Sequence, residues 1–569
     1  MLSKINDDDI HRYFVYPLVF FNRNKDWSMI DISKQEVNKN EYLKELKTIL
    51  NIPNEIEKNK GDKKSLMSIL EEKDNTFIIN SDTFKKIALI FYQIQAGIPV
   101  IIIGETGCGK TKIIIKLNQL LNNGESKLEI IKINPKITEV KLIQIMKILD
   151  DKAVNQKEEF WIFFDDINTC FCMPLLTEIF INRSYNGKKL NENIRLIGAC
   201  NPYRKRKVDK INNVSIIFNQ LLPFNKANNP PIYEIQPLPQ SLYYYAINFG
   251  WISDKDEEQY IYDIIEQLFS KNEKNLHEIT KDAIYECHKY LRKNFGPSRI
   301  SFRDILRFVK CVDFFKKYFT KKNEFLNKKN NDNNNKLRSI ICSIYLCYYT
   351  SLSNDNRREE LDINLGQILS ETINNKEFID EMVEKKEKMI DSFSDFLKRE
   401  QKFFLNQFEL IKGMVKDNLF MENIFSSFIS IFTGIPLIII GERRKRSLSI
   451  NIITNSMSGK YSNNKFFQLF PKIYELYFQG SNSTLLEDIE CLFTRAKNSL
   501  NNLLKKKEEL GIISIIFDKL GLTYNSNNDY LQILHTKLDN LSKEKNISFI
   551  GISNNSLDEA KLNRALVLS

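Results

Sequence analysis

The stretch VIIIGETGCGKTKIIIKL, from Val100 to Leu117, decides the fold class of this 569-residue chain. Its apolar start is typical of a short buried strand, and its end has the apolar spacing of a helix. Between them the residues match the pattern G-x-x-x-x-G-K-[ST], whose backbone N–H groups and helix N-terminus surround phosphate groups. The sequence therefore predicts a nucleotide-binding loop made of Gly104, Glu105, Thr106, Gly107, Cys108, Gly109, Lys110 and Thr111.

Two side chains of this loop, and one beyond it, are expected to hold a magnesium nucleotide. The Lys110 ammonium is expected to bridge the β- and γ-phosphates of ATP, and the Thr111 hydroxyl to bind Mg²⁺. The apolar stretch EFWIFF at 159–164 predicts a second buried strand, and Asp165 follows it directly. A carboxylate at that strand end is the expected partner of Thr111 at the metal ion. ATP and Mg²⁺ are therefore the predicted cofactors.

Asp166 and Asn201 are the predicted catalytic residues of this site. Asp166 occupies the position after the Mg²⁺ carboxylate, where a glutamate commonly orients the attacking water. Aspartate is shorter by one methylene group. This difference affects the expected rate of hydrolysis, but it does not exclude the reaction. Asn201 follows the strand IRLIGAC at 194–200, and its side chain is expected to contact the γ-phosphate or the water.

Strands and helices alternate along the first part of the chain, which predicts an α/β fold with a parallel sheet. A helix is expected at 81–97, before the first strand, and LEIIKIN at 128–134 predicts another strand. After residue 242 we expect no further strands in this part, and 243–320 has helical patterning. The polar run at 327–336 predicts a loop tip.

The strand and loop pattern then repeats. GIPLIIIGE at 434–442 copies GIPVIIIGE at 97–105 almost residue for residue, and 511–520 and 547–555 parallel the two later strands described above. This is an internal repeat of one α/β unit. The second copy reaches Ser569 without a helical lid, so we expect either a fragment of a longer chain or an incomplete module. The predicted parts are a charged and helical extension (1–80), a first α/β module (81–240), a helical lid and linker (241–415) and a second α/β module (416–569).

The nucleotide-binding loop of the second copy is defective. Gly441 is kept, but the second glycine is missing and the loop is one residue shorter before Ser447. Arg446 stands in place of the lysine, and its planar guanidinium is a poor substitute in a tight phosphate loop. Lys519 follows Asp518, which places a cation where water would be activated. We expect no hydrolysis there, while residual nucleotide binding and a merely solvated basic loop are the alternatives.

Composition argues against several classes of protein. The net charge of +11 comes from 83 basic and 72 acidic residues, but the lysines are spread among asparagines, so we do not expect a nucleic-acid partner. Nine scattered cysteines without a C-x-x-C pair, together with four histidines, predict free thiols and no zinc site. No apolar run is long enough to span a membrane, and the N-terminus lacks the pattern of a secretory signal. We therefore expect a cytosolic or nuclear compartment, with cytoplasmic as the working assignment.

The combination of phosphate loop, carboxylates and asparagine resembles that of the AAA+ ATPases. The resemblance is strongest to the mysterin family, whose members are giant RING-finger ubiquitin ligases. Its first active ATPase module resembles GIPVIIIGETGCGKT, FFDDINT, ACNPYRK and QPLPQSL of this chain, and its next module resembles GISNNSLDEAKLNRALVLS. The resemblance covers roughly residues 80 to 569 and implies tandem P-loop AAA+ modules with an all-helical lid between them. It also implies ATP hydrolysis at the first module and ubiquitin-system partners. Because the sequence has no Cys/His constellation of a RING, ligase activity would need a part not present, a non-RING element or another subunit.

The AAA+ resemblance also implies two arginine roles. AAA+ modules assemble into rings in which each site borders the next module, so other AAA+ modules or subunits are expected partners. An arginine of the neighbour reaches the γ-phosphate there, and Arg564, in KLNRAL, is the expected residue. Arg303, in ISFRDILRF, would return to the nucleotide from the lid. The alternative for Arg564 is an ion pair with a surface carboxylate, and for Arg303 an ordinary solvated position.

Two other functions fit parts of the sequence. A scaffold that binds ATP without hydrolysing it is favoured by Asp166 and by the defective second site. A nucleic-acid-remodelling motor is suggested only by the net charge. ATP hydrolysis at the first module is the favoured hypothesis.

Overall fold

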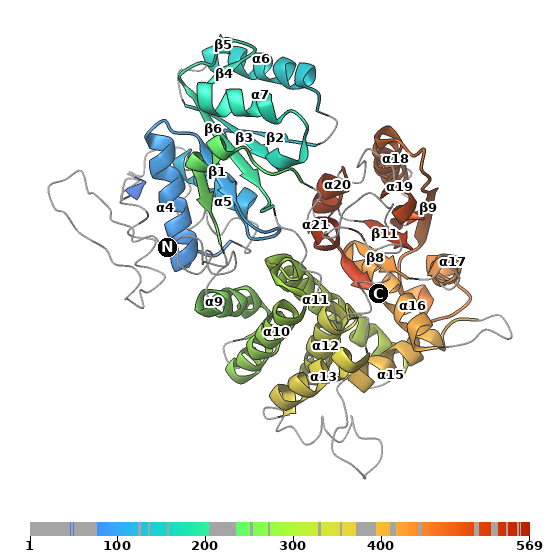
Figure 1. The fold of residues 1–569 in the computed structure, drawn as a ribbon. Helices are drawn as coiled ribbons and strands as arrows, with labels where there is room; N and C mark the ends of the chain where they lie inside the picture. The colour runs from blue at the N-terminus through green and yellow to red at the C-terminus, as the bar shows by residue number, and fades with distance from the viewer. Residues whose placement is uncertain are drawn as a thin grey trace, which may run out of the picture. The chain divides into compact units, whose positions relative to one another are not determined.

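The protein, seen here in a computed structural model, forms two compact units, Met1–Ile264 and Ile265–Ser569 (Figure 1). The structure describes Leu46, Ile49, Leu50, 77–122, 127–134, 137–155, 159–203, 235–250, 254–270, 273–327, 332–352, 355–370, 394–409, 417–441, 446–505, 511–524, 533–541, 544, 546–554, 557 and 559–568.

The first unit is built on a five-stranded sheet whose strand pairs are all parallel. The apolar residues of its central strands are buried without alternation, as expected where helices cover both faces. This confirms the predicted α/β fold. The strand order is β2 (Leu128–Lys132), β3 (Phe160–Asp165), β6 (Ile194–Cys200), β1 (Val100–Ile103) and β7 (Ala246–Asn248).

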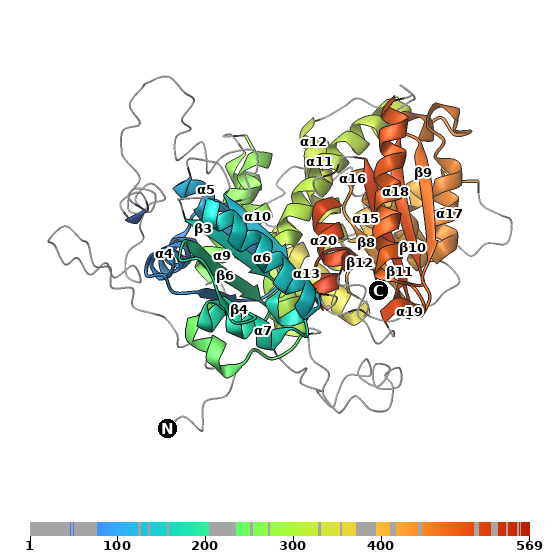
Figure 2. The same ribbon diagram turned by 90° about the horizontal axis from the view of Figure 1, so that it is seen from above.

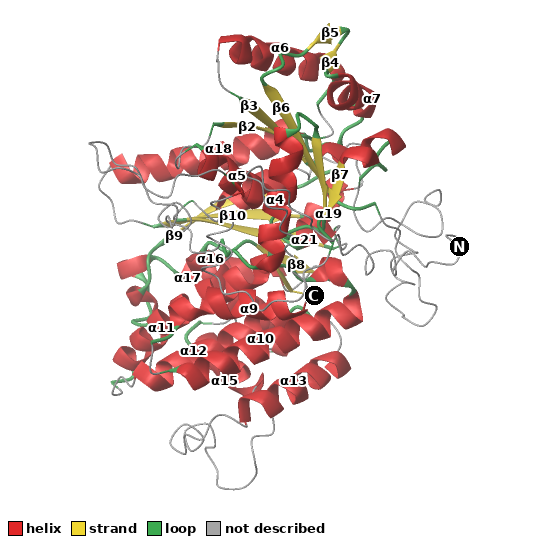
Figure 3. Ribbon diagram, turned by 90° about the vertical axis from the view of Figure 1, so that its left-hand side faces the viewer, coloured by secondary structure: helices red, strands yellow, loops and turns green. Residues whose placement is uncertain are grey.

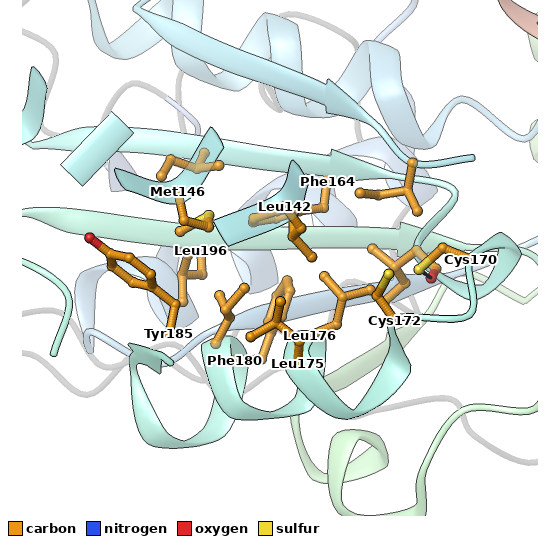
Figure 4. Packing of buried hydrophobic residues seen from close by; sticks show 14 of the residues in the cluster. Leu142, Met146, Phe164, Cys170, Cys172, Leu175, Leu176, Phe180, Tyr185 and Leu196 are labelled. Atoms are coloured by element: carbon orange, nitrogen blue, oxygen red, sulfur yellow. Dashed lines mark hydrogen bonds between the residues drawn. The ribbon is translucent and has the colours of Figure 1, made fainter. Parts of the chain in front are cut away.

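Helices cover both faces of this sheet. α4 (Ser81–Gln95) and α5 (Lys110–Leu121) pack on one face, in a core shared with β1. α6 (Glu139–Asn155) and α7 (Met173–Thr177) pack on the other, where labelled apolar side chains of both meet those of the sheet (Figure 4). The smaller elements are η2 (Ile167–Thr169), η3 (Glu178–Asn182), β4 (Ser184–Tyr185), β5 (Lys188–Lys189), η4 (Gln240–Tyr245) and α9 (Asp254–Ile265).

One strand of this sheet contradicts the sequence-based expectation that strands end at residue 242. β7 pairs with β1, with Ile101 opposite Ala246, and so forms the edge of the sheet. The strand has only three residues, and its neighbours in the chain carry no strand pattern. It forms because β1 offers it a backbone partner, which is a tertiary cause that local patterning does not reveal.

The second unit begins with a helical region, in which the described residues from 266 to 433 contain helices and no strand (Figure 3). Its long helix α11 begins with a capping box. The Ser301 N–H donates to Asp304 Oδ2 at 2.8 Å, and Ser301 Oγ accepts from Arg303 N at 3.3 Å. The elements are η5 (Glu266–Leu268), α10 (Lys274–Phe295), η6 (Pro297–Arg299), α11 (Phe302–Phe325), α12 (Asp332–Ile344), η7 (Tyr345–Tyr349), α13 (Asp355–Ser370), α15 (Ser394–Leu405) and α16 (Asn418–Thr433).

The helix α12 corrects the predicted loop tip at 327–336. Residues 328–331 lie outside the described residues, but Asp332 already begins the helix. The Asn335 side chain is buried there and accepts a hydrogen bond from Asn323 Nδ2 at 3.1 Å. A polar run that composition marks as exposed is therefore held in a helix by a buried amide pair.

The same unit contains a second parallel sheet with the same strand order as the first. α17 and α18 lie on its two sides (Figure 2). The internal repeat predicted from sequence is thus present in the fold. Its strands in spatial order are β9 (Ile473–Gln479), β10 (Ile512–Asp518), β11 (Ile547–Ser553), β8 (Leu437–Ile440) and β12 (Leu566–Leu568), and its helices are α17 (Arg446–Ser456), η8 (Gly459–Tyr461), η9 (Phe467–Leu469), α18 (Leu486–Lys505), α19 (Leu520–Tyr524), α20 (Ile533–Leu541) and α21 (Glu559–Leu562).

An aromatic cluster joins the helical region to the second sheet's module. Tyr318 of α11 lies 6.1 Å from the ring of Phe466, which belongs to the segment between α17 and β9. Phe404 of α15 and Phe428 of α16 lie 4.3 Å apart, and both contact the same cluster. Each buried ring contributes a large apolar area, so the helical region and the second α/β module share one core.

Candidate nucleotide site

The loop between β1 and α5 is shaped by three glycines. Gly107 and Gly109 have φ angles of 79° and 89°, which favour glycine. A Cβ atom on Gly104 would lie 2.8 Å from Cys108 Sγ and 3.1 Å from Phe249 Cβ, so a side chain does not fit there. The Gly104 N–H donates to Cys200 O at 3.2 Å, which ties the start of the loop to the end of β6.

Lys110, the first residue of α5, is buried within this loop. Its Nζ donates hydrogen bonds to Gly104 O at 2.5 Å and to Glu105 O at 2.9 Å. It also donates to Asn201 Oδ1, 3.0 Å away beyond the end of β6. The predicted lysine and the predicted asparagine are therefore in direct contact.

Thr111 and Asp165 are likewise brought together. Thr111 Oγ1 donates to Asp165 Oδ2 at 3.1 Å. Burial, and then the negative charge of Asp166, raise the pKa of Asp165 to about 6, while the positive charge of Lys110 opposes the rise. A divalent cation bound to these two oxygen ligands would hold the carboxyl ionised.

Asp166 lies at the end of β3 in the left-handed region, with φ of 58°. Its carboxylate Oδ1 accepts from Asn201 Nδ2 at 3.4 Å, and its carbonyl accepts from Thr169 N at 3.1 Å. Non-glycine residues are rare in this conformation, which here turns the chain sharply at the strand end. The predicted catalytic pair thus lies side by side.

Asn168 is a site residue that the sequence reasoning missed. It is buried, and its Nδ2 donates to Asn201 O at 2.8 Å, which fixes the backbone of the asparagine. It stands inside the stretch FFDDINT, but nothing in its spacing assigns it a role. The one local feature that could have drawn attention to Asn168 is its closeness to Asp166, two residues earlier in the chain.

The two predicted arginines both lie in the second unit, where they share one carboxylate. Arg564 Nε donates to Asp539 Oδ2 at 3.2 Å, and Arg303 Nη2 lies 3.4 Å from Asp539 Oδ1. Arg307 reinforces this region by donating to Asn563 O at 2.5 Å. The carboxylate pairing considered as the alternative for Arg564 is therefore present, and Arg303 is partly buried rather than simply solvated.

The second copy of the site keeps the backbone turn of the first but differs in its buried cation and in the partner of its carboxylate. Arg446 is buried, so the alternative of a solvated basic loop is wrong at this residue, while 442–445 lie outside the described residues. Lys519 adopts the same left-handed conformation as Asp166, with φ of 56°. Asp518 Oδ2 accepts from Tyr477 OH at 2.6 Å. Tyr477 comes from β9, and sequence reasoning did not foresee its contact.

Further features limit the kinds of site in the described part of the chain. None of its helices combines the length and apolar character that crossing a membrane requires. It holds no group of three or more His, Cys, Asp or Glu side chains able to bind a metal ion. All nine cysteines are free, and seven of them are buried. A Mg²⁺ ion held by one carboxylate, one hydroxyl and phosphates does not require such a group.

Comparisons with known proteins identify both modules. Family models described as RNF213 AAA domains match residues 77–204 and 413–569. The E3 ubiquitin-protein ligase RNF213 of Homo sapiens is 26% identical over 534 residues, which are 87% of this chain and 10% of that protein. The E3 ubiquitin-protein ligase rnf213-beta of Danio rerio is 25% identical over 574 residues, covering 95% of this chain and 11% of the relative.

The E3 ubiquitin-protein ligase RNF213 of Mus musculus is 25% identical over 534 residues, which are 87% of this chain and 10% of that protein. The chain thus spans about a tenth of the length of these curated relatives. The segment 77–204 holds four of the five strands of the first sheet, all except β7, and the segment 413–569 holds all five strands of the second sheet. Together these findings show that the chain belongs to the RNF213, or mysterin, family, as a region that carries two of its AAA modules.

Proposed function

We propose that the first α/β module binds ATP with Mg²⁺ and hydrolyses the nucleotide. One observation carries the proposal: hydrogen bonds join the phosphate loop to the ends of two other strands. Lys110 bonds Asn201, 91 residues away along the chain, and Thr111 bonds Asp165, 54 residues away. A glycine-rich turn without a ligand has no need to gather these side chains at one place.

The residues present fit a magnesium nucleotide. Gly104 leaves the backbone bare where a side chain would crowd the loop. Lys110 supplies a buried positive charge for the β- and γ-phosphates, and burial strengthens that attraction because less water screens it. Thr111 and Asp165 supply the oxygen ligands that Mg²⁺ prefers. When bound, Mg²⁺ would neutralise negative charge on the phosphates.

Asp166 would orient the attacking water and accept its proton. Its carboxylate is held by Asn201 Nδ2, and Asn168 in turn holds the Asn201 backbone. This chain of contacts fixes the direction of a short side chain at a sharp turn. Such positioning is the main contribution a protein makes to phosphoryl transfer.

A second candidate function is a scaffold that binds ATP without hydrolysing it. The same contact favours it, because the Asp166 carboxylate already accepts a hydrogen bond from Asn201 and is one methylene shorter than glutamate. Both candidates share the nucleotide site. They differ only in turnover.

The wider role we propose is that of an AAA core in a ubiquitin ligase. The relatives are named E3 ubiquitin-protein ligases, and this chain corresponds to about a tenth of their length. The helical region and the second α/β module form one compact unit with a shared aromatic core. Hydrolysis at the first module would drive or gate a conformational change in this core.

The test measures ATP binding and ATP hydrolysis by the full chain, with Lys110→Ala as the comparison. This change removes the buried cation from the loop, so ATP affinity should fall about tenfold or more, equivalent to about 1.4 kcal/mol or more. Lys112→Ala, on the exposed side of the same helix, is the matched control and should bind as the wild type does. Unchanged affinity in Lys110→Ala would contradict the site. Binding without turnover above that variant would select the scaffold.

A further inference from the structure

The two phosphate loops start in the same way but carry different cations at the start of the helix that follows. Gly441 N donates to Ser553 O at 3.2 Å, as Gly104 N does to Cys200 O. Arg446 begins α17 just as Lys110 begins α5. The two residues therefore hold equivalent places in the repeat, although the second loop is shorter.

Their cationic groups reach different partners. Lys110 bonds two carbonyls of its own loop and the side chain of Asn201. Arg446 Nη1 instead donates to Ser553 O at 2.7 Å and to Ile439 O at 3.4 Å. These carbonyls belong to β11 and β8, the two neighbouring strands whose ends form the floor of the loop. Arg446 thus links the ends of both strands by hydrogen bonds.

The guanidinium also lies against Gly441, the residue at which the loop starts. Its Nη2 lies 3.3 Å from the position that a Cβ atom on Gly441 would take, and the residue is only 3% exposed. Burying a guanidinium is costly unless its donors are satisfied, and strand carbonyls satisfy part of that need here. The guanidinium therefore bonds the ends of two strands, whereas the Lys110 ammonium bonds carbonyls of its own loop and the Asn201 side chain.

Asp518, the counterpart of the proposed Mg²⁺ ligand Asp165, is also held by contacts within the protein. Asp518 Oδ2 accepts from Tyr477 OH at 2.6 Å and lies 3.5 Å from Ser447 Oγ. Its Oδ1 accepts from Lys519 N at 2.7 Å. In the first module the corresponding Asp165 has the Thr111 hydroxyl as its hydrogen-bond donor, and Ile130 holds the strand position that Tyr477 has in the second. Both halves of a magnesium-nucleotide site are thus replaced by internal contacts.

We propose that the Arg446 guanidinium takes, at the ends of β8 and β11, the place that a nucleotide's phosphate group would have, so that this module excludes nucleotide and keeps one conformation whether ATP or ADP is present. The inference rests on contacts within the second unit alone and does not depend on hydrolysis at the first. It assigns Arg446 the structural work that a bound phosphate group would otherwise do, which is to hold the two strand ends together.

The first test counts nucleotides. Equilibrium dialysis of the full wild-type chain with saturating Mg·ATP should find no more than one ATP per chain, and Lys110→Ala should remove that one. Two ATP per chain, or saturable binding that persists in Lys110→Ala and is weakened by Arg446→Ala, would overturn the proposal. No binding at all would support exclusion at the second module while contradicting the proposed function of the first.

The second test is chemical rescue of Arg446→Ala. Removing the side chain leaves a cavity at the strand ends and takes one hydrogen-bond donor from each of the Ser553 and Ile439 carbonyls, so the Tm of the second unit should fall by about 5 °C or more. Millimolar ethylguanidinium should restore part of that loss, whereas ethylammonium should not, because only the planar fork has the required donors.

The matched control is Arg495→Ala, an exposed arginine of α18, which should show neither loss nor rescue. A full wild-type Tm in Arg446→Ala would overturn the proposal, as would stabilisation of that variant by both cations equally. If Arg446→Ala does not fold at all, dialysis of the wild type and of Lys110→Ala decides the matter, because both proteins keep Arg446: two ATP per chain, or saturable binding that remains in Lys110→Ala, would overturn the proposal.

Discussion

Arg564 donates a hydrogen bond from Nε to the Asp539 carboxylate at 3.2 Å. The other oxygen of that carboxylate faces Arg303, at 3.4 Å. Two arginines expected to act on nucleotide, one from the helical region and one from the second α/β module, are thus held by a single acidic residue of α20.

Arg564→Ala should reduce the kcat for ATP hydrolysis at the first module by about 10²-fold or more, with little change in ATP affinity. The reason is that a neighbour's arginine stabilises charge that develops only in the transition state. Arg564→Lys should recover little, since it lacks the planar fork. Steady-state kcat and KM check this, with Arg495→Ala as the control. Full activity in Arg564→Ala would remove the arginine role proposed for the second module.

Arg303→Ala should act on binding more than on turnover. If Arg303 contacts the nucleotide, its loss should raise KM about tenfold, the effect of one charge-assisted contact, and leave kcat nearly unchanged. Asp539→Asn is the useful comparison because it breaks the ion pair while keeping both arginines. Equal losses of Tm in both variants, without any change in KM, would show that Arg303 serves only the ion pair.

Asp166→Asn should leave ATP bound but lower kcat, because only the organisation of the transition state is lost. Asp166→Glu is the opposite change, and a gain in rate there would show that the missing methylene limits the wild type. Single-turnover measurements separate these effects from product release. If Asp166→Asn turns over as fast as the wild type, Asp166 is not the residue that orients water.

Nucleotide binding that depends on Mg²⁺ should weaken below about pH 6. Burial and the charge of Asp166 raise the pKa of Asp165 from 3.8 to about 6, so the proton competes with the metal below that pH. The same shift means that the native state binds this proton more tightly than the unfolded state, so the contribution of Asp165 to stability falls as pH rises from about 4 to 6.

Titrating Mg²⁺ at fixed nucleotide between pH 5 and 8 checks this prediction about the metal ligand. The Asp165→Asn variant is the control, since it shares the nucleotide's own titration and lacks the carboxyl. An identical pH profile in both proteins would contradict the assignment of Asp165 to the metal.

The parallel α/β modules, their repetition and the residues that meet at the first candidate site could be predicted from the sequence alone. Gly104 to Thr111 form a local motif whose glycines and helix start specify a backbone shape directly. Asp165 and Asn201 could be placed because each follows a buried strand, and the ends of parallel strands meet at one edge of the sheet. The contacts Lys110–Asn201 and Thr111–Asp165 confirm that these residues lie together.

The partners of the remaining groups depend on long-range contacts and became evident in the folded chain. β7 exists because β1 offers it a backbone edge, and the polar start of α12 is helical because Asn335 pairs with Asn323. Arg446 could have been a solvated cation by its sequence, but the structure turns it onto the strand ends of β8 and β11. The physical reason is common to all three: burial and hydrogen-bond partners come from residues distant in the chain, and no local periodicity encodes them.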